Sequence, residues 1–119
     1  MSRSAAKVLA DLLDAAEAAA DLVARGRSSF DEDRLLRLAV EAIVGRIGDA
    51  AKKLLEIYGD HLPRKIPWVD IVANRIVVDH AYHRIDYDTV WVTLTDDVPF
   101  VKRSLESWAA RGGLDDVVR

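Results

Sequence analysis

The segment DEDRLLRLAVEAIVGRIGDAAKKLLEIY, residues 31–58, decides the fold because apolar side chains cover most of its helical circumference. Its polar residues and two glycines share one narrow stripe: Arg34, Arg37, Glu41, Gly45, Gly48 and Lys52. The rest of its surface is apolar: Leu35, Leu36, Ala39, Val40, Ile43, Val44, Ile47, Ala50, Ala51 and Leu54. Such a helix lies at the centre of a bundle or is shared with a partner subunit. We therefore expect one long helix from Asp31 to about Tyr58, with Ser29 or Asp31 as its N-cap.

Two glycines, Gly45 and Gly48, lie inside this long helix, where each costs roughly 1 kcal/mol relative to alanine. Their presence predicts that another group approaches the helix backbone closely. Either a neighbouring helix or a bound ligand would satisfy this prediction.

The segment before the long helix predicts another amphipathic helix over residues 5–24, because its apolar residues recur at spacings of three and four. Ser4 is the expected N-cap and Gly26 the expected stop. Its charged residues fall on the opposite strip: Asp11, Asp14, Asp21 and Arg25. Acidic residues at every turn exclude a membrane span and a signal-peptide core, so we expect a cytoplasmic protein.

Three shorter helices are predicted after the long one. The connector YGDHLPRKIPW, residues 58–68, leads to a helix from Pro67 to about His83. Asp86 should cap a fourth helix to about Thr95, which TDDVP ends, and a fifth starts around Pro99 and reaches about Ala110. We expect His61 at the surface, and three tryptophans as core anchors: Trp68, Trp91 and Trp108. No stretch shows sustained strand alternation, so the fold class is all-α, a four- to five-helix bundle.

The amino-acid composition restricts the possible folds more than it restricts the possible functions. The 119 residues suit one domain spanning 1–119, with 50% hydrophobic and 31% charged residues. A net charge of -3 argues against a strongly basic surface that coats nucleic acid, but it is compatible with a local basic groove. The absence of cysteine excludes disulfides, thiolate metal sites and cysteine nucleophiles.

Chemically capable side chains concentrate in ANRIVVDHAYHRID, residues 73–86. At about 100 degrees per residue, one arc of roughly 160 degrees holds five of them. These are Arg75, Asp79, His80, Tyr82 and His83. The remaining arc holds apolar residues: Ile71, Val77, Val78 and Ala81. The helix is therefore expected to have a core face and a polar face.

Two interpretations of this polar face remain open. An Arg75–Asp79 pair at i,i+4 would be worth only about 0.3–0.5 kcal/mol, as on an ordinary solvated surface. Alternatively, arginine binds phosphate bidentately and histidine transfers protons near neutral pH. Arginine together with histidine, without a carboxylate cluster or a cysteine, suits metal-independent attack of a ribose 2′-hydroxyl on the adjacent phosphate. The substrate would then be RNA, because DNA lacks that hydroxyl.

Arg75, His80 and Tyr82 follow the order R-x4-H-x-Y, which resembles the motif of the HepT toxins in the HEPN superfamily of small helical ribonucleases. The resemblance extends over residues 37–54, with Gly-Asp-Ala-Ala-Lys at 48–52. It also covers residues 66–91, from a Pro-Trp helix start through the motif to Ile-Asp and a later Trp. Only the first helix is generic.

The resemblance implies an all-α, HEPN-like homodimer paired with a nucleotidyltransferase antitoxin of the MNT type. Arg75 would bind the scissile phosphate of RNA and His80 would transfer protons, with both protomers facing one groove. Tyr82 is the hydroxyl that the antitoxin blocks in some members, by adding AMP units from ATP. The magnesium for that transfer belongs to the antitoxin, so no cofactor is expected in this chain.

One position departs from the family pattern. The residue after the motif arginine is usually polar, commonly asparagine, and here it is Ile76, while Asn74 precedes the arginine. Asn74, Asp79 and His83 are candidates for supporting the site. Two alternatives to a nuclease therefore stay open. One is a non-catalytic HEPN subunit that holds nucleotide or RNA for its nucleotidyltransferase partner, and the other is a structural dimerisation module.

Overall fold

The computed structural model describes residues 2–73 and 86–115, with side chains from Ala5 onward. Within these ranges all regular elements are helical, which confirms the expected all-α bundle. The named elements are α1 (Ser2–Val23), α2 (Arg27–Glu32), α3 (Arg34–Tyr58), η1 (Gly59–His61), α5 (Tyr87–Val92), η3 (Thr93–Asp97), α6 (Val98–Ala110) and η4 (Gly113–Asp115). Residues 68–73 form a further helical segment. No helix in the described ranges is long and apolar enough to cross a membrane.

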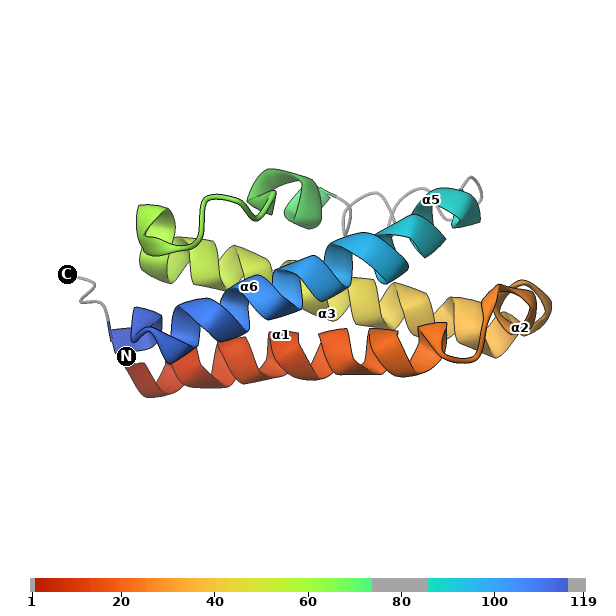
Figure 1. Cartoon of the computed structure of the whole chain (residues 1–119), viewed down its shortest axis with the longest axis horizontal. Helices are drawn as coiled ribbons and strands as arrows, with labels where there is room; N and C mark the ends of the chain where they lie inside the picture. Colours follow the sequence, from red (N-terminus) through yellow and green to blue (C-terminus); the bar gives the residue numbers. More distant parts are fainter. Residues whose placement is uncertain (1, 74–85, 116–119) are drawn as a thin grey trace.

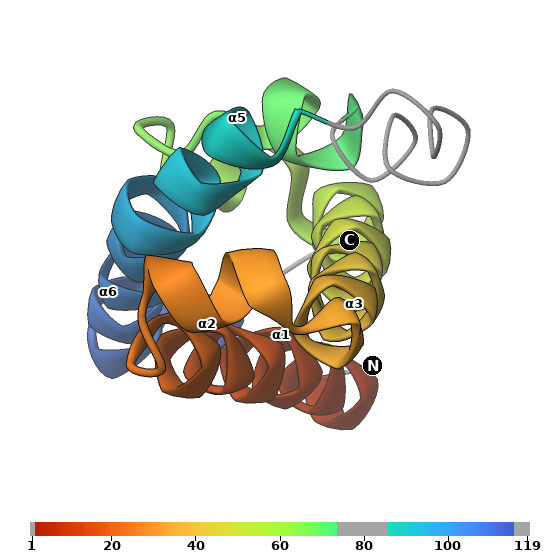
Figure 2. The same cartoon turned by 90° about the vertical axis from the view of Figure 1, so that its right-hand side faces the viewer.

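Three long rods build the bundle. In Figure 1, α1 runs in one direction and both α3 and the α5–α6 path return beside it. Figure 2 looks along these rods and shows α1, α3 and α6 arranged around a common interior, with α2 crossing one end. The fully buried side chains that fill this interior come from every rod: Leu12, Ala19, Phe30, Val40, Ala51, Leu54 and Leu105. Short alanine side chains on α1 let it approach α3 closely.

The long helix begins later than the sequence predicts. The expected turn RGRSS instead belongs largely to α2, and Asp33 interrupts the helical path with extended backbone angles. The Asp33 Oδ1 accepts a hydrogen bond from the Leu35 N–H at 2.9 Å, so Asp33 is the N-cap rather than Ser29 or Asp31. The cap was predicted wrongly because residues 31–33 are three acids in succession, and the local sequence does not show which of them caps the helix. Phe30 is buried in the core and keeps the residues just after it in α2, so the cap falls on Asp33. Similarly, α1 already begins at Ser2, before the predicted cap Ser4.

TDDVP does not end the helix that starts at Tyr87. Residues Thr93–Asp97 form one π-helical turn, and Val92, Asp97 and Val98 keep helical backbone angles, so the helix continues into α6. Pro99 lies in the first turn of α6, as predicted. Proline lacks an N–H and its ring crowds the carbonyl four residues earlier. The wider π turn just before it relieves that crowding, which is why the chain bulges here and does not break.

The tryptophans act as anchors. Trp68 and Trp108 are buried, and Trp91 is half-buried against the Phe30 ring at 5.2 Å between ring centroids. The Trp108 Nε1–H donates to the backbone carbonyl of His61 at 3.0 Å, while the His61 side chain is exposed as expected. Close approach to Gly45 is not found among the described residues, since none of their atoms lies within 4 Å of where its Cβ would be.

Candidate functional site

The residues predicted to carry the chemistry lie outside the described ranges. They are Arg75, His80 and Tyr82, with Asn74, Asp79 and His83 as candidate supporting residues and Ile76 as the departure. Their roles therefore stay predictions. The structure does describe the two elements that lead into and out of residues 74–85, and these anchor the candidate segment from both sides.

The upstream anchor is the helical segment 68–73. The Pro67 carbonyl accepts the Ile71 N–H at 3.0 Å, so the helix begins where the sequence predicts. The Trp68 Nε1–H donates to the Pro63 carbonyl at 3.0 Å and fixes the first turn on the preceding loop. Ile71 and Val72 are half-buried against the core, whereas Val69 points outward. The candidate segment thus leaves from a helix whose rotation about its axis is set by packing.

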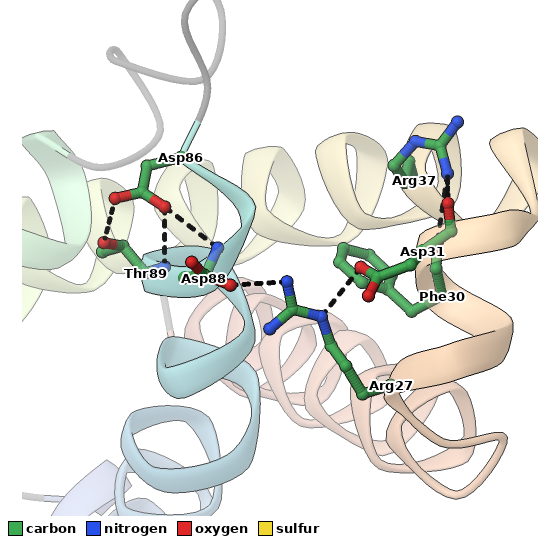
Figure 3. Close-up of polar contacts among 7 residues, drawn as sticks. All are labelled: Arg27, Phe30, Asp31, Arg37, Asp86, Asp88 and Thr89. Atoms are coloured by element: carbon green, nitrogen blue, oxygen red, sulfur yellow. Dashed lines mark hydrogen bonds and ion pairs between the residues drawn. The ribbon is translucent and has the colours of Figure 1, made fainter.

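The downstream anchor is the capped start of α5. As predicted, Asp86 is the N-cap, and its Oδ1 accepts the N–H groups of Asp88 at 3.0 Å and Thr89 at 3.3 Å. Its Oδ2 accepts the Thr89 hydroxyl at 3.0 Å (Figure 3). The hydroxyl bond, followed by the backbone bonds, holds the pKa of Asp86 below its usual value. The carboxylate therefore stays ionised and fixes the point where the candidate segment ends.

Arg27 ties this capped turn to α2. Figure 3 shows its guanidinium between two carboxylates, with Nη2 at 2.6 Å from the Asp88 Oδ1 and Nε at 2.8 Å from the Asp31 Oδ1. These hydrogen bonds, to Asp31 first and Asp88 second, raise the pKa of Arg27. The Arg37 Nη1 donates to the Asp31 carbonyl at 2.6 Å and thereby caps the last turn of α2. Charged contacts thus join α2, α3 and α5 at one end of the bundle.

Beneath these charges lies an aromatic contact. Phe30 is fully buried, and its ring lies 5.6 Å from the Tyr87 ring, edge to face. Arg27 and Phe30 could not be predicted from their local sequence, because their partners in α5 are more than fifty residues away. The available signal was one large aromatic residue inside the polar stretch RGRSSFDED, residues 25–33. Within the described residues, no group of three His, Asp or Glu side chains could hold a metal ion.

Comparison with known proteins identifies the family. The family model described as "Ribonuclease HepT-like" matches residues 12–108, which include both anchors and the segment between them. A relative from Methanocaldococcus jannaschii, named "Putative RNase MJ1380", is 29% identical over 103 residues, covering 83% of this chain and 94% of the relative. The "Probable ribonuclease HepT" of Thermococcus cleftensis is 30% identical over 74 residues, covering 62% and 66%. No solved structure gave a significant match. The chain therefore belongs to the HepT-like family of the HEPN superfamily.

Proposed function

We propose that this protein is a ribonuclease toxin of a HEPN/MNT-type toxin–antitoxin system, which cleaves RNA without a metal ion through Arg75 and His80. The observation that carries the proposal is the family match over residues 12–108, which contains Arg75, His80 and Tyr82 in the order of the family motif. The names of the relatives from M. jannaschii and T. cleftensis, "Putative RNase MJ1380" and "Probable ribonuclease HepT", support nuclease activity.

The proposed reaction is a transesterification within the RNA, in which the bond from phosphorus to the 5′-oxygen breaks as a bond from phosphorus to the 2′-oxygen forms. His80 assists removal of the 2′-hydroxyl proton as the 2′-oxygen attacks the adjacent phosphorus, and the 5′-oxygen leaves with a proton. Arg75 neutralises the charge that grows on the phosphate oxygens. The requirement for a 2′-hydroxyl restricts the reaction to RNA, because DNA lacks that group.

We also propose that the active form is a homodimer in which both protomers present these residues to one groove. The resemblance of the motif segment to the HEPN superfamily, within the family match over residues 12–108, supports this arrangement. The proposed antitoxin is an MNT-type nucleotidyltransferase that attaches AMP to Tyr82. Phosphates added beside Arg75 would compete with the RNA backbone for the same guanidinium.

Cleavage of RNA by the purified protein in excess EDTA tests the nuclease proposal. His80→Ala should abolish cleavage, while His61→Ala is the matched control because His61 is exposed and lies outside the motif. Equal cleavage by wild type and His80→Ala would refute the role of His80. For the antitoxin, the intact mass of the toxin after co-expression with the gene beside it should rise by AMP-sized steps, and Tyr82→Phe should remove them.

A second candidate function rests on Ile76, which replaces the family's usual polar residue. A non-catalytic HEPN subunit would hold nucleotide or RNA for the nucleotidyltransferase partner. It would form a stable complex with that partner and bind RNA, yet show no cleavage with any RNA tested. Restoring the family residue with Ile76→Asn separates the two functions, since cleavage gained by this variant would identify a weakened nuclease.

A further inference from the structure

A groove rich in positive charge lies between the loop at residues 62–67 and one face of α6. Its volume is about 640 Å³, within the range of roughly 300–1,000 Å³ found for ligand sites. We call it the basic groove, and its polar lining consists of Arg64, Lys65, Arg103, Ser104, Ser107 and Arg111. Figure 1 shows the loop, in green, on the side of the bundle that α6 borders. None of its lining residues belongs to the motif assigned to cleavage.

The charge of the basic groove is not compensated locally. Four of the lining side chains are cations and none is acidic, although the protein as a whole carries a net charge of -3. Among the described residues, Arg64, Lys65 and Arg103 make no ion pair. Glu106, the nearest acid along α6, binds Lys102 at 3.2 Å outside the groove. The basic groove is therefore a local concentration of positive charge on an acidic protein.

Both walls of the basic groove are held in place. Leu62 and Ile66 are buried, and the two indole N–H groups that reach the His61 and Pro63 carbonyls fix the backbone of the loop. On α6, the five lining residues from Phe100 to Arg111 fall within an arc of roughly 100 degrees, so they share one helix face. The Arg111 Nη1 also donates to the Ser107 hydroxyl at 2.5 Å. Little reordering of the backbone is needed to receive a ligand.

The lining matches the chemistry of a polynucleotide strand. Arginine forks and serine hydroxyls are the groups that contact phosphate oxygens. Phe100, which is half-buried in the groove wall, offers a ring on which an unpaired base can stack. An acidic protein segment would suit the cations, but it would make no use of an aromatic ring beside two hydroxyls.

We propose that the basic groove binds the backbone of single-stranded RNA away from the cleaved bond, as a subsite of the ribonuclease. This inference rests on the proposed function. Phe100 lies 14 residues after Asp86 on an uninterrupted helical path, a distance of roughly 20 Å. Loss of the basic groove should therefore weaken RNA binding and raise KM, while the kcat set by Arg75 and His80 stays the same.

The test removes two cations from the groove and compares the result with an equal loss elsewhere. The groove pair is Arg64→Gln with Arg103→Gln, one from each wall. The control pair is Arg25→Gln with Arg34→Gln, because both are exposed, both flank α2, and the net charge changes equally. In Figure 1, α2 lies at the other end of the bundle from the loop at residues 62–67. All proteins carry His80→Ala so that RNA is not cut, and binding of a labelled oligouridine is followed by fluorescence anisotropy at several salt concentrations.

Each phosphate contact on a single strand contributes about 0.7 to the slope of log K against log salt. The groove pair should therefore lower the magnitude of that slope by about 1.4, and the control pair should leave it unchanged. An unchanged slope in the groove pair, or an equal loss in both pairs, overturns the proposal. The proposal is also overturned if the groove pair still binds RNA but no longer binds polyglutamate, because the groove would then be assigned to an acidic protein segment.

These outcomes are independent of the cleavage assay. A wild-type protein that binds oligouridine through the groove but cuts no RNA would refute the nuclease proposal and support the groove as a binding site. If a variant that carries the groove pair but keeps His80 cuts RNA with the same KM as the wild type, the nuclease proposal is supported and the subsite is refuted.

Discussion

Phe30 is the side chain by which α2 holds the start of α5, and its replacement tests how the downstream anchor is stabilised. It is 0% exposed, and its ring contacts those of Tyr87 and Trp91 at centroid distances of 5.6 Å and 5.2 Å. Phe30→Ala removes a fully buried ring and leaves a cavity between α2, α3 and α5. A substitution of this kind costs about 3–5 kcal/mol of unfolding free energy.

The two ring contacts place the expected loss in the upper part of that range. Each aromatic pair contributes about 0.5–1.5 kcal/mol beyond the area that it buries. Phe30→Leu keeps most of the apolar volume and loses both pairs, so we expect it to cost about 1–3 kcal/mol. A domain of this kind is stable by about 5–15 kcal/mol, so both variants should remain folded enough for measurement at 25 °C.

Urea denaturation followed by far-ultraviolet circular dichroism gives both free energies, provided that the dependence on urea is the same as in the wild type. Leu35→Ala serves as the control, because Leu35 is largely exposed at the start of α3 and should cost less than about 0.5 kcal/mol. If Phe30→Ala loses no more than Leu35→Ala, α2 does not hold α5 through this ring and our account of the downstream anchor is wrong.

Three further predictions concern the cap residues and one glycine. Asp33→Ala removes the cap of α3 and should lower the unfolding free energy by about 1 kcal/mol. In urea titrations this loss should be larger than that caused by Asp31→Ala. Because the pKa of Asp86 is lowered in the fold, its charge stabilises the protein fully above its usual value of 3.8, and this contribution is lost as pH falls through the lowered pKa. The advantage of wild type over Asp86→Asn should therefore shrink in acid, and a difference that does not depend on pH would contradict the assignment. Gly113→Ala should cost about 1–3 kcal/mol in thermal or urea melts, because a Cβ there would overlap the Trp108 indole, and an unchanged stability would show that the ring can move aside.

Local signals were enough to predict much of the fold. The start of the helix at Pro67, the cap at Asp86 and the end of α1 before Gly26 each depend on a few neighbouring residues whose preferences agree. The break at Asp33 and the π turn at Thr93–Asp97 could not be predicted in this way. The break at Asp33 depends on the packing of Phe30 against rings of α5, which are distant in sequence. The π turn depends on how the helix accommodates Pro99 without ending.

The helical wheel of the candidate segment was also only partly informative. Ile71 packs inward as expected, but Trp68 and Val72 pack inward too. On the wheel Trp68 and Val72 lie about 20 and 60 degrees to one side of the angle assigned to Arg75, and Ile71 lies about 40 degrees to the other side. The inward arc of the described turn therefore includes that angle. The basic groove could not be predicted from local sequence, because its walls come from a loop and from a helix some forty residues later.

The loop that Trp68 and Trp108 hold has a consequence for the segment after it. Because both indoles bond to carbonyls of this loop, its length fixes the rotational phase of the helix that leads toward Arg75. Deleting one residue between Pro63 and Pro67 would turn the helical segment 68–73 by about 100 degrees about its axis, unless Trp68 gave up its hydrogen bond. Relatives whose loop between Pro63 and Pro67 is longer or shorter should therefore carry a different residue at the position of Trp68. Relatives with a loop of the same length should keep the tryptophan.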